Sequence, residues 1–261
     1  MAQETAIKAF VLAGARASGD QLASRFDVPS KAYIQIAGRS MLGRVLDALH
    51  QSERVGGLSV IGLAEHGDLQ HAETWPRFVS LPGADGPAAS VAGALASNRD
   101  PFPALVTTCD HALLTPEIVD GFLYEIEGQD IDLAVALARR QDIEAAYPDV
   151  KRTYLSFGDG AYSSCNLFCL KTPEAARVVT FWKTAEEDRK RPWRLAWRFG
   201  VVSAIRLLVG RPPIEKAFRI LSGSLGVRVH PVILPFADAA VDVDTPDDLA
   251  LVERVLSRRP Q

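Results

Sequence analysis

Short apolar runs alternate with longer segments whose apolar residues recur every three or four positions along the first half of the chain. The runs are typical of strands buried on both faces of a sheet, and the longer spacing is typical of helices that cover such a sheet. We expect strands at 7–13, 57–64, 77–81, 103–109 and 131–138. We expect helices at 40–49, at 88–96 and from Pro116, where Thr115 is a suitable N-cap. This alternation predicts an α/β fold with a mostly parallel, Rossmann-like central sheet and helices on both faces.

The second half of the chain follows a different pattern. Residues 153–157 and 164–170 are expected to form a hairpin with an Asp159-Gly160 turn, and apolar runs follow at 227–234 and 239–243. Thr245 precedes Pro and two acids, which predicts the start of a final helix. We therefore expect one domain over residues 1–261, with a helical, basic insertion at 185–222.

Composition agrees with an ordinary globular enzyme. The 261 residues are 48% hydrophobic and 23% charged, and three cysteines are too few and too irregularly spaced for a disulfide framework. The N-terminus lacks a signal peptide pattern, and no window reaches the roughly 18 apolar residues of a membrane-spanning helix. These features favour a cytoplasmic protein.

Charge is unevenly distributed. The net charge is −3, yet residues 189–219 carry nine Lys or Arg and one acid. Within this segment Trp193 and Trp197 lie four residues apart, as do Arg194 and Arg198. An aromatic face beside a basic face suits peripheral contact with the inner membrane surface, and it equally suits packing on the domain or a homodimer contact. We expect no nucleic-acid binding, because base-stacking sites do not accompany the basic charge.

The loop after the first strand contains glycines, and ligands of parallel sheets bind beyond such strand ends. Two familiar phosphate motifs do not fit it. Ala15 and Arg16 break a dinucleotide fingerprint, and Asp20 stands where a P-loop needs Lys.

Four blocks of sequence, in the same order, resemble a third motif. The first block consists of Leu12-Ala13-Gly14, Pro29-Ser30-Lys31 and residues 36–42. The second is Asp85-Gly86-Pro87 with Ser90. The third runs from Val106 to Pro116 around Asp110, and the fourth runs from Val241 to Leu249. Together they resemble the nucleotidyltransferases that include the molybdenum-cofactor guanylyltransferases and the sugar-phosphate and methylerythritol cytidylyl- and uridylyltransferases. The chain is similar to a long, uncharacterised branch of this family.

The resemblance implies a GT-A-like fold and a nucleoside triphosphate site. Backbone amides of the loop and two cations would hold the phosphates, which also agrees with the physics of anion-binding loops. The implied nucleotide-binding residues are Leu12, Ala13, Gly14, Ala15, Lys31, Gly86, Ser90 and Asp110. The second cation is either Arg16 or Arg25. The loop departs from the family at Ala15, where a second glycine is usual, so triphosphate binding is a firmer expectation than turnover.

Carboxylates at two apolar runs suggest a metal site. Asp110 ends one run, and alternation places Asp242 and Asp244 on one side of another. A Mg²⁺ ion that bridges Asp110 and Asp244 would satisfy both carboxylates and bind phosphate oxygens, with Asp242 as the alternative ligand. One of the two later acids could instead cap the helix that begins at Pro246. His111 is a minor candidate for a base.

The implied reaction is attack of an acceptor phosphate oxygen on the α-phosphorus, with pyrophosphate leaving and no covalent nucleophile. Lys151, Arg152, Tyr154 and Asn166 flank the hairpin and are candidates for binding a phosphorylated small-molecule or lipid-precursor acceptor. An exposed hairpin with solvated charges is the alternative.

Two other functions stay open. A nucleotide-sugar glycosyltransferase of related fold usually needs Asp-x-Asp at the central strand end, where this chain has Asp110-His111-Ala112. The altered glycine loop also fits a regulatory relative that binds nucleotide without turnover.

Overall fold

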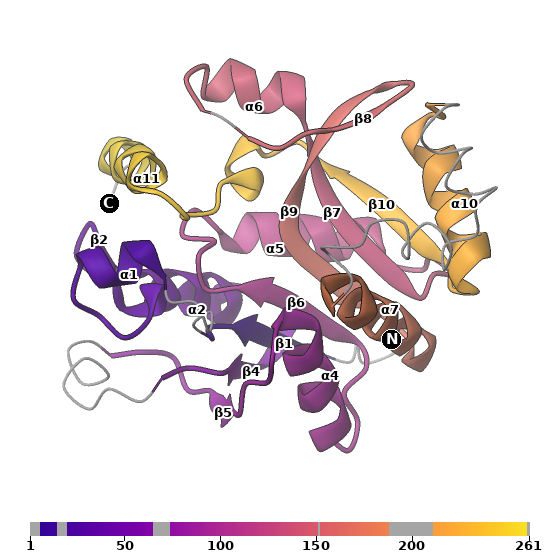
Figure 1. The fold of residues 1–261 in the computed structure, drawn as a ribbon, viewed down its shortest axis with the longest axis horizontal. Helices are drawn as coiled ribbons and strands as arrows, with labels where there is room; N and C mark the ends of the chain where they lie inside the picture. Colours follow the sequence, from indigo (N-terminus) through magenta and orange to yellow (C-terminus); the bar gives the residue numbers. More distant parts are fainter. Residues whose placement is uncertain (1–5, 15–19, 65–73, 151, 188–210, 260–261) are drawn as a thin grey trace.

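The computed structural model describes residues 6–14, 20–64, 74–150, 152–187 and 211–259. A central sheet runs through it in the order β10-β7-β9-β6-β1-β4-β5, and β8 pairs with β9 (Figure 1). Its strands are β1 (Ile7–Leu12), β4 (Val55–Ile61), β5 (Val79–Leu81), β6 (Ala104–Thr108), β7 (Leu133–Arg139), β8 (Leu155–Phe157), β9 (Gly160–Leu170) and β10 (Val229–Leu234). The mostly parallel α/β sheet predicted from the sequence is confirmed.

Strand β9 runs antiparallel to both of its neighbours, whereas β10–β7, β6–β1, β1–β4 and β4–β5 are parallel pairs. Phe168 of β9 pairs with Val106 of β6 on one side and with Val135 of β7 on the other. The register with β7 shifts after Val135, near Asn166, whose φ is +48°. The β8–β9 hairpin is as predicted, but its turn is Gly158-Asp159, one residue earlier than expected.

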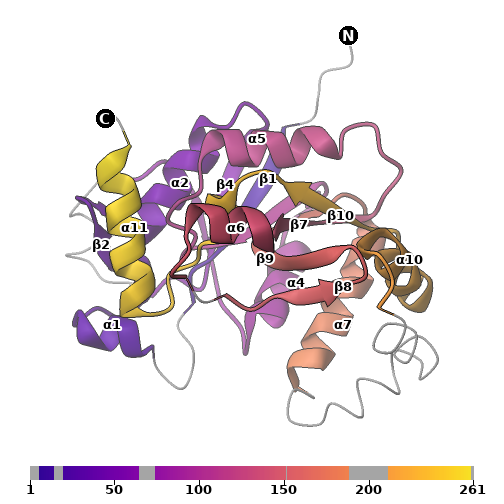
Figure 2. The same ribbon diagram turned by 90° about the horizontal axis from the view of Figure 1, so that it is seen from above.

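Helices cover both faces of the sheet, also as predicted. Helices α2 (Met41–Gln51) and α5 (Pro116–Glu125) contact each other on one face, and α4 (Pro87–Ser97) and α7 (Ala176–Glu187) contact each other on the opposite face (Figure 2). Helix α10 (Ile214–Leu225) packs on β10. The apolar side chains of each pair fill a separate core cluster against the sheet. Burial of these apolar faces supplies the main stabilisation of the fold.

A third apolar cluster is formed by side chains of elements from both ends of the chain. It contains side chains of α1 (Gln21–Arg25), the segment 34–36, the loop after β6 and α11 (Pro246–Arg258). The other short elements are η1 (Lys31–Tyr33), β2 (Gln35–Ile36), β3 (Arg39–Ser40), α6 (Arg140–Ala146), η2 (Pro173–Ala175) and η3 (Ala237–Ala240). This cluster brings the N-terminal loop region and the C-terminal acids to the same side of the molecule (Figure 1).

The run at 239–243 is not a strand of the sheet. It begins within η3 and continues as extended backbone, in which the Val243 amide donates to the Asp110 carbonyl at 3.0 Å. Val241 and Val243 are fully buried, so side chains still alternate without strand pairing. The capping role suggested for Asp242 or Asp244 is wrong. Thr245 caps α11 in a capping box with Asp248.

The region expected as a basic insertion is described only at its edges. Helix α7 ends at Glu187 and α10 begins at Ile214, while Trp193 and Trp197 lie outside the described residues. Membrane contact through these tryptophans therefore stays a prediction, as does a homodimer. Within the described ranges, no helix is long and apolar enough to cross a membrane.

Candidate active site

The carboxyl end of β1 is fixed by hydrogen bonds from both neighbouring strands. The Leu12 carbonyl accepts from the Cys109 amide at 2.9 Å, and the Ala13 amide donates to the Ile61 carbonyl at 2.9 Å. Gly14 follows directly, exposed at the edge of the sheet where parallel strands bind ligands. The predicted nucleotide loop therefore starts from a rigid strand end.

A buried serine sets the position of Lys31. The Ser30 hydroxyl donates to the Ala13 carbonyl at 3.2 Å, and its oxygen accepts from the Ala32 amide at 3.3 Å as the N-cap of η1. Ser30 is 1% exposed. It thus ties the backbone of Lys31 to the end of β1.

Lys31 joins two of the predicted carboxylates. Its Nζ lies 2.5 Å from Asp110 Oδ2 and 2.6 Å from Asp244 Oδ1. The Asp110 side chain also accepts a hydrogen bond from the Thr108 hydroxyl. Asp110 is held at the end of β6, whereas Asp244 is held by the extended segment before α11. The structure therefore brings together residues that are far apart in the sequence.

The electrostatics of this cluster favour a charged lysine. Burial lowers the pKa of Lys31, but attraction to Asp110 and hydrogen bonds to Asp110 and Asp244 outweigh burial. The net effect raises the pKa of Lys31 above its ordinary value. The Lys31 side chain in this cluster is therefore a charged ammonium at neutral pH.

Asp242 has different partners. Its carboxylate accepts hydrogen bonds from the Arg152 guanidinium and, at 3.4 Å, from Asn166 Nδ2. Arg152 also forms an ion pair with Asp248, at 3.1 Å between Nη2 and Oδ1. Burial raises the pKa of Asp242, with Arg152 acting in the opposite direction. Arg152 thus links the segment before β8 to the start of α11.

A cavity of about 530 Å³ lies beside Gly14, at the ends of β1, β4 and β5. Three glycines bring these strand ends close together: a Cβ added to Gly62 would lie 3.2 Å from the Cα atoms of both Gly14 and Gly83. Gly62 also has a φ of +73°, which favours glycine. We call this glycine backbone, which lines the cavity, its floor.

Two of the residues predicted to bind the nucleotide, Gly86 and Ser90, shape the loop beside this cavity. Ser90 lines it, and its Oγ accepts from the Ala84 amide at 2.9 Å, which closes the loop before α4. Gly86, with a φ of +104°, ends that loop as the residue before Pro87. Ser90 and Gly86 thus hold the loop in shape around the cavity.

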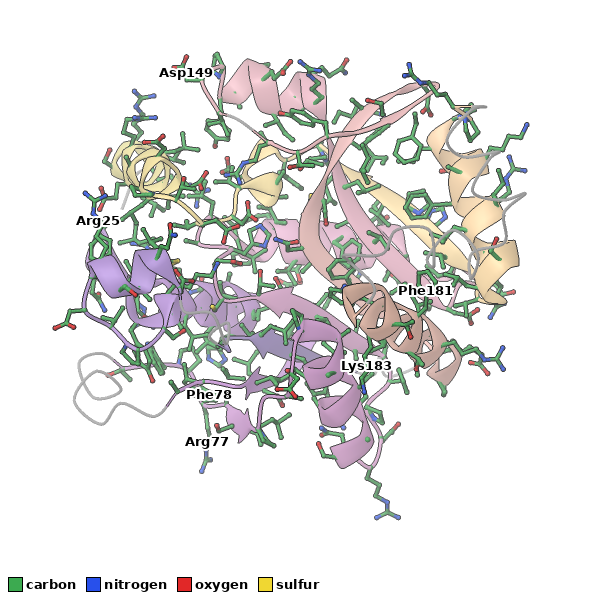
Figure 3. All side chains as sticks on the ribbon, in the orientation of Figure 1. Arg25, Arg77, Phe78, Asp149, Phe181 and Lys183 are labelled. Atoms are coloured by element: carbon green, nitrogen blue, oxygen red, sulfur yellow. The ribbon has the colours of Figure 1, made fainter. Side chains whose placement is uncertain are left out.

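A larger cavity of about 900 Å³ is lined by Asp244. Its lining combines charged, polar and apolar residues and includes Arg152 and Asn166, two of the residues predicted to bind the acceptor, together with Asp149, Val150, Thr153, Leu155, Ser163, Ser164, Asp242, Thr245, Asp247, Asp248, Ala250, Leu251 and Arg254. Figure 3 shows Asp149 beyond the end of α6. Tyr154 does not line this cavity, and its ring instead lies 5.2 Å from the Arg140 guanidinium. Lys151 lies outside the described residues.

The second cation predicted for the triphosphate is not placed in the cluster. Arg25 is the last residue of α1 and is exposed at the surface (Figure 3). Ala15 and Arg16 lie outside the described residues. His111 is buried and lines neither cavity; burial lowers its pKa to about 4. A neutral, enclosed imidazole of such low basicity is poorly suited to act as a base.

The donor set at Asp110 and Asp244 fits a small divalent cation. Within the described ranges, no group of three or more His, Cys, Asp or Glu residues converges as a complete protein cage. Magnesium does not require one, since it is usually held by one or two carboxylates together with substrate phosphates and water. The Lys31 ammonium now lies between the two carboxylate oxygens, which shows that their geometry accommodates a cation.

Several residues of the site were not predicted from the sequence. Thr108 and Ser30 position the two predicted charges, and Gly62 and Gly83 form the cavity floor. The signal for the glycines is their place, since Gly62 directly follows β4 and Gly83 lies two residues after β5. Thr108 and Ser30 belong to the sequence blocks around Asp110 and Lys31, but nothing in the local sequence indicates the partners of their hydroxyls.

The sheet order and the helices on both faces define an α/β domain of the Rossmann-like type. The MobA-like NTP transferase domain model matches residues 9–234, so the chain belongs to that family. No curated protein sequence matches the chain.

Solved structures agree with this assignment. A hypothetical transferase from Thermus thermophilus superposes with a TM-score of 0.78 at 28% identity, over 94% of this chain and 100% of that one. A CMP-2-keto-3-deoxy-manno-octonic acid synthetase in complex with CTP gives 0.56 at 13% identity, over 98% and 99%. A 4-diphosphocytidyl-2C-methyl-D-erythritol synthase from Anaerococcus prevotii gives 0.57 at 10% identity, over 97% and 96%. The last two share the fold with this chain.

Proposed function

We propose that this protein is a Mg²⁺-dependent nucleotidyltransferase that transfers a nucleoside monophosphate from a nucleoside triphosphate to a phosphorylated acceptor. The observation that carries the proposal is the Lys31–Asp110–Asp244 cluster at the carboxyl end of the sheet. The larger cavity is lined by Asp244, and the smaller one by Gly14, which follows the strand end to which Ser30 ties Lys31. This arrangement suits transfer between two substrates.

The nucleotide is assigned to the side of β1. Its base would lie over the glycine floor near Gly62, and its phosphates beside Gly14 and Lys31, where backbone amides and an ammonium offset their charge. Membership of an NTP transferase family supports a triphosphate as the donor.

The acceptor is assigned to the larger cavity, whose serine, threonine and asparagine residues suit a hydrogen-bonding molecule. An oxygen of its phosphate attacks the α-phosphorus, and the bond from that phosphorus to the oxygen bridging the β-phosphorus breaks. A phosphate is already ionised near neutral pH, so no protein base is needed. The negative charge that develops on the bridging oxygen leaves with pyrophosphate. The residues contribute positioning and charge neutralisation.

Asp110 and Asp244 would hold Mg²⁺, which supplies neutralisation of charge on the phosphate oxygens. Lys31 would stabilise the leaving pyrophosphate. Asp242 is already paired with Arg152 at the acceptor side. It is therefore less available to the metal than Asp244 and remains only the alternative ligand.

Pyrophosphate release tests the proposal, measured with the four nucleoside triphosphates against a panel of phosphorylated sugars, polyols and lipid precursors in the presence of Mg²⁺. Release that depends on one donor and one acceptor is expected. Triphosphate binding without release under any combination would favour the regulatory relative. Transfer of sugar from a nucleotide sugar, without pyrophosphate, would favour the glycosyltransferase.

A further inference from the structure

The Lys31 ammonium and a divalent cation cannot both occupy the space between Asp110 and Asp244. The ammonium lies 2.5 and 2.6 Å from one oxygen of each carboxylate. Magnesium binds carboxylate oxygens at about 2.0–2.1 Å, so the position it needs overlaps the position of Nζ. Binding of the metal therefore requires that Lys31 leave the pair.

The surroundings allow the ammonium to leave without loss of the carboxylate geometry. The backbone of Lys31 is fixed by Ser30, but its side chain has a flexible four-carbon stem. Asp110 keeps its hydrogen bond from Thr108, and the Val243 amide keeps the segment of Asp244 attached to the Asp110 carbonyl. The movement can thus be confined to one side chain.

The two carboxylates differ in access. The Asp244 side chain is 47% exposed and the Asp110 side chain is 11% exposed. A cation arriving from solvent therefore meets Asp244 first, on the side of the larger cavity. Lys31, once displaced, needs another anion, because an unpaired charge in a partly buried site is costly.

We propose that Lys31 is the counter-cation of the Asp110–Asp244 pair in the nucleotide-free protein, and that it exchanges with the metal when the metal and the triphosphate bind together. Asp110 and Asp244 would then hold the metal, and the Lys31 ammonium would form ion pairs with the phosphates of the nucleotide. Free metal alone has to displace Lys31 without giving it a new partner. The exchange therefore opposes metal binding until the nucleotide arrives, so the two bind cooperatively.

Binding of Mn²⁺ alone to the nucleotide-free protein tests this exchange, with the free ion measured by electron paramagnetic resonance. Lys31→Met removes the competing ammonium and is expected to bind Mn²⁺ at least about fivefold more tightly than the wild type. Lys216→Met makes the same change of charge at an exposed position on α10 and should bind as the wild type does. Adding Asp244→Asn to Lys31→Met should abolish the gain.

The proposal would be overturned if Lys31→Met bound Mn²⁺ no more tightly than the wild type, or did not bind it at all. It would also be overturned if Lys216→Met showed the same gain as Lys31→Met. The neutral, polar Lys31→Gln should show the same gain as Lys31→Met. If both variants fail to fold because the two carboxylates have lost the ammonium between them, Mn²⁺ is expected to restore folding in each. Failure to restore it also contradicts the exchange.

This inference rests on the metal site of the proposed function, yet the two can fail separately. Metal-dependent turnover by the wild type, without tighter Mn²⁺ binding by Lys31→Met, would overturn the exchange and leave the function standing. Tighter binding without turnover for any pair of substrates would do the reverse.

Discussion

Asp110 is the most enclosed of the three acids at the site. Its side chain is 11% exposed, against 27% for Asp242 and 47% for Asp244. It contacts Lys31 and Thr108, and its carbonyl accepts the Val243 amide. Asp110 therefore holds the lysine through its carboxylate, and it holds the segment that carries Asp244 through its backbone carbonyl.

Replacing this carboxylate by its amide should remove turnover and leave the fold intact. Asp110→Asn still offers an oxygen to Thr108, but it no longer offers a negative charge to a cation. We expect pyrophosphate release to fall at least about 100-fold, the usual loss when one preorganised electrostatic contact is removed. Circular dichroism checks the fold, and Asp100→Asn, at an exposed position, is the control. Undiminished release by Asp110→Asn would refute the metal assignment.

Arg152 illustrates how a partner far along the chain changes the role of a residue. From sequence it is a free cation for an acceptor phosphate, yet its side chain is 9% exposed and bound to both Asp242 and Asp248. Local sequence cannot reveal such neutralisation, because both acids lie about ninety residues further along the chain and meet Arg152 only after folding.

Arg152→Lys should therefore lower stability even though it keeps the charge, since lysine lacks the planar fork that reaches two carboxylates. We expect the free energy of unfolding to fall by about 1–3 kcal/mol, measured by urea titration. Arg254→Lys, in the same cavity but outside this ion pair, is the comparison. Equal stability of Arg152→Lys and the wild type would show that the two ion pairs contribute little.

At the scale of elements, three strand ends meet through glycine. The backbones of β1, β4 and β5 approach so closely after their last residues that a Cβ at Gly62 would lie 3.2 Å from two Cα atoms. The same position has a φ that an L-residue adopts with strain. Both effects act on the floor of the smaller cavity.

Gly62→Ala should weaken triphosphate binding and lower the free energy of unfolding by about 1–2 kcal/mol. Equilibrium binding of a labelled triphosphate and urea unfolding measure the two effects. Gly93→Ala is the control, since nothing lies within 4 Å of its added Cβ. Unchanged affinity in Gly62→Ala would contradict the assignment of the base to this cavity.

The starts of β7 and β10 are connected by an ion pair at the opposite end of the sheet. Asp132 accepts hydrogen bonds from the Arg228 side chain and amide and from the Thr172 hydroxyl. The bonds from Arg228 outweigh burial and hold the pKa of Asp132 well below its usual 3.8. Since the folded carboxyl is the stronger acid, its contribution to stability is complete above that value and is lost as the pH falls below it.

Asp132→Asn should thus cost about 1–2 kcal/mol of unfolding free energy at neutral pH. The difference from the wild type should stay constant down to about pH 5 and shrink as the pH falls through 3.8. Urea titrations at several pH values measure it, with Asp100→Asn, at an exposed position outside this ion pair, as control. A difference that widens in acid would contradict this account.

Over the whole molecule, the candidate site draws on segments from both ends of the chain, so a bound nucleotide should stabilise all of it. A triphosphate with Mg²⁺ at a hundredfold excess over its Kd should add about 2.7 kcal/mol, seen as a higher Tm. A chelator should remove most of the gain, and Asp110→Asn should show little of it. An equal gain in Asp110→Asn would indicate that the nucleotide binds elsewhere.

Much of this architecture could be predicted from the sequence, because local signals agree with it. Thr115 and Thr245 begin helices through hydrogen bonds that their side chains make within one turn. The order of strands could not be predicted, since the apolar run of β9 has the same pattern as a parallel strand. Nor could the segment at 239–243, whose amides bond to Asp238 and Asp110 instead of to a strand. Sequence motifs proposed Lys31, Asp110 and Asp244, but only folding shows that the lysine bonds to both acids.

The antiparallel strand between β6 and β7 has a consequence for the order of folding during synthesis. Strand β6 ends at Thr108, and β9, which covers its outer edge, begins only at Gly160. At about 5–20 residues per second, the ribosome leaves that edge uncovered for several seconds. Strand β7 emerges in the meantime and is parallel to β6, so premature pairing of these two strands would exclude β9. The native sheet therefore forms only if β9, and not β7, pairs with the free edge of β6.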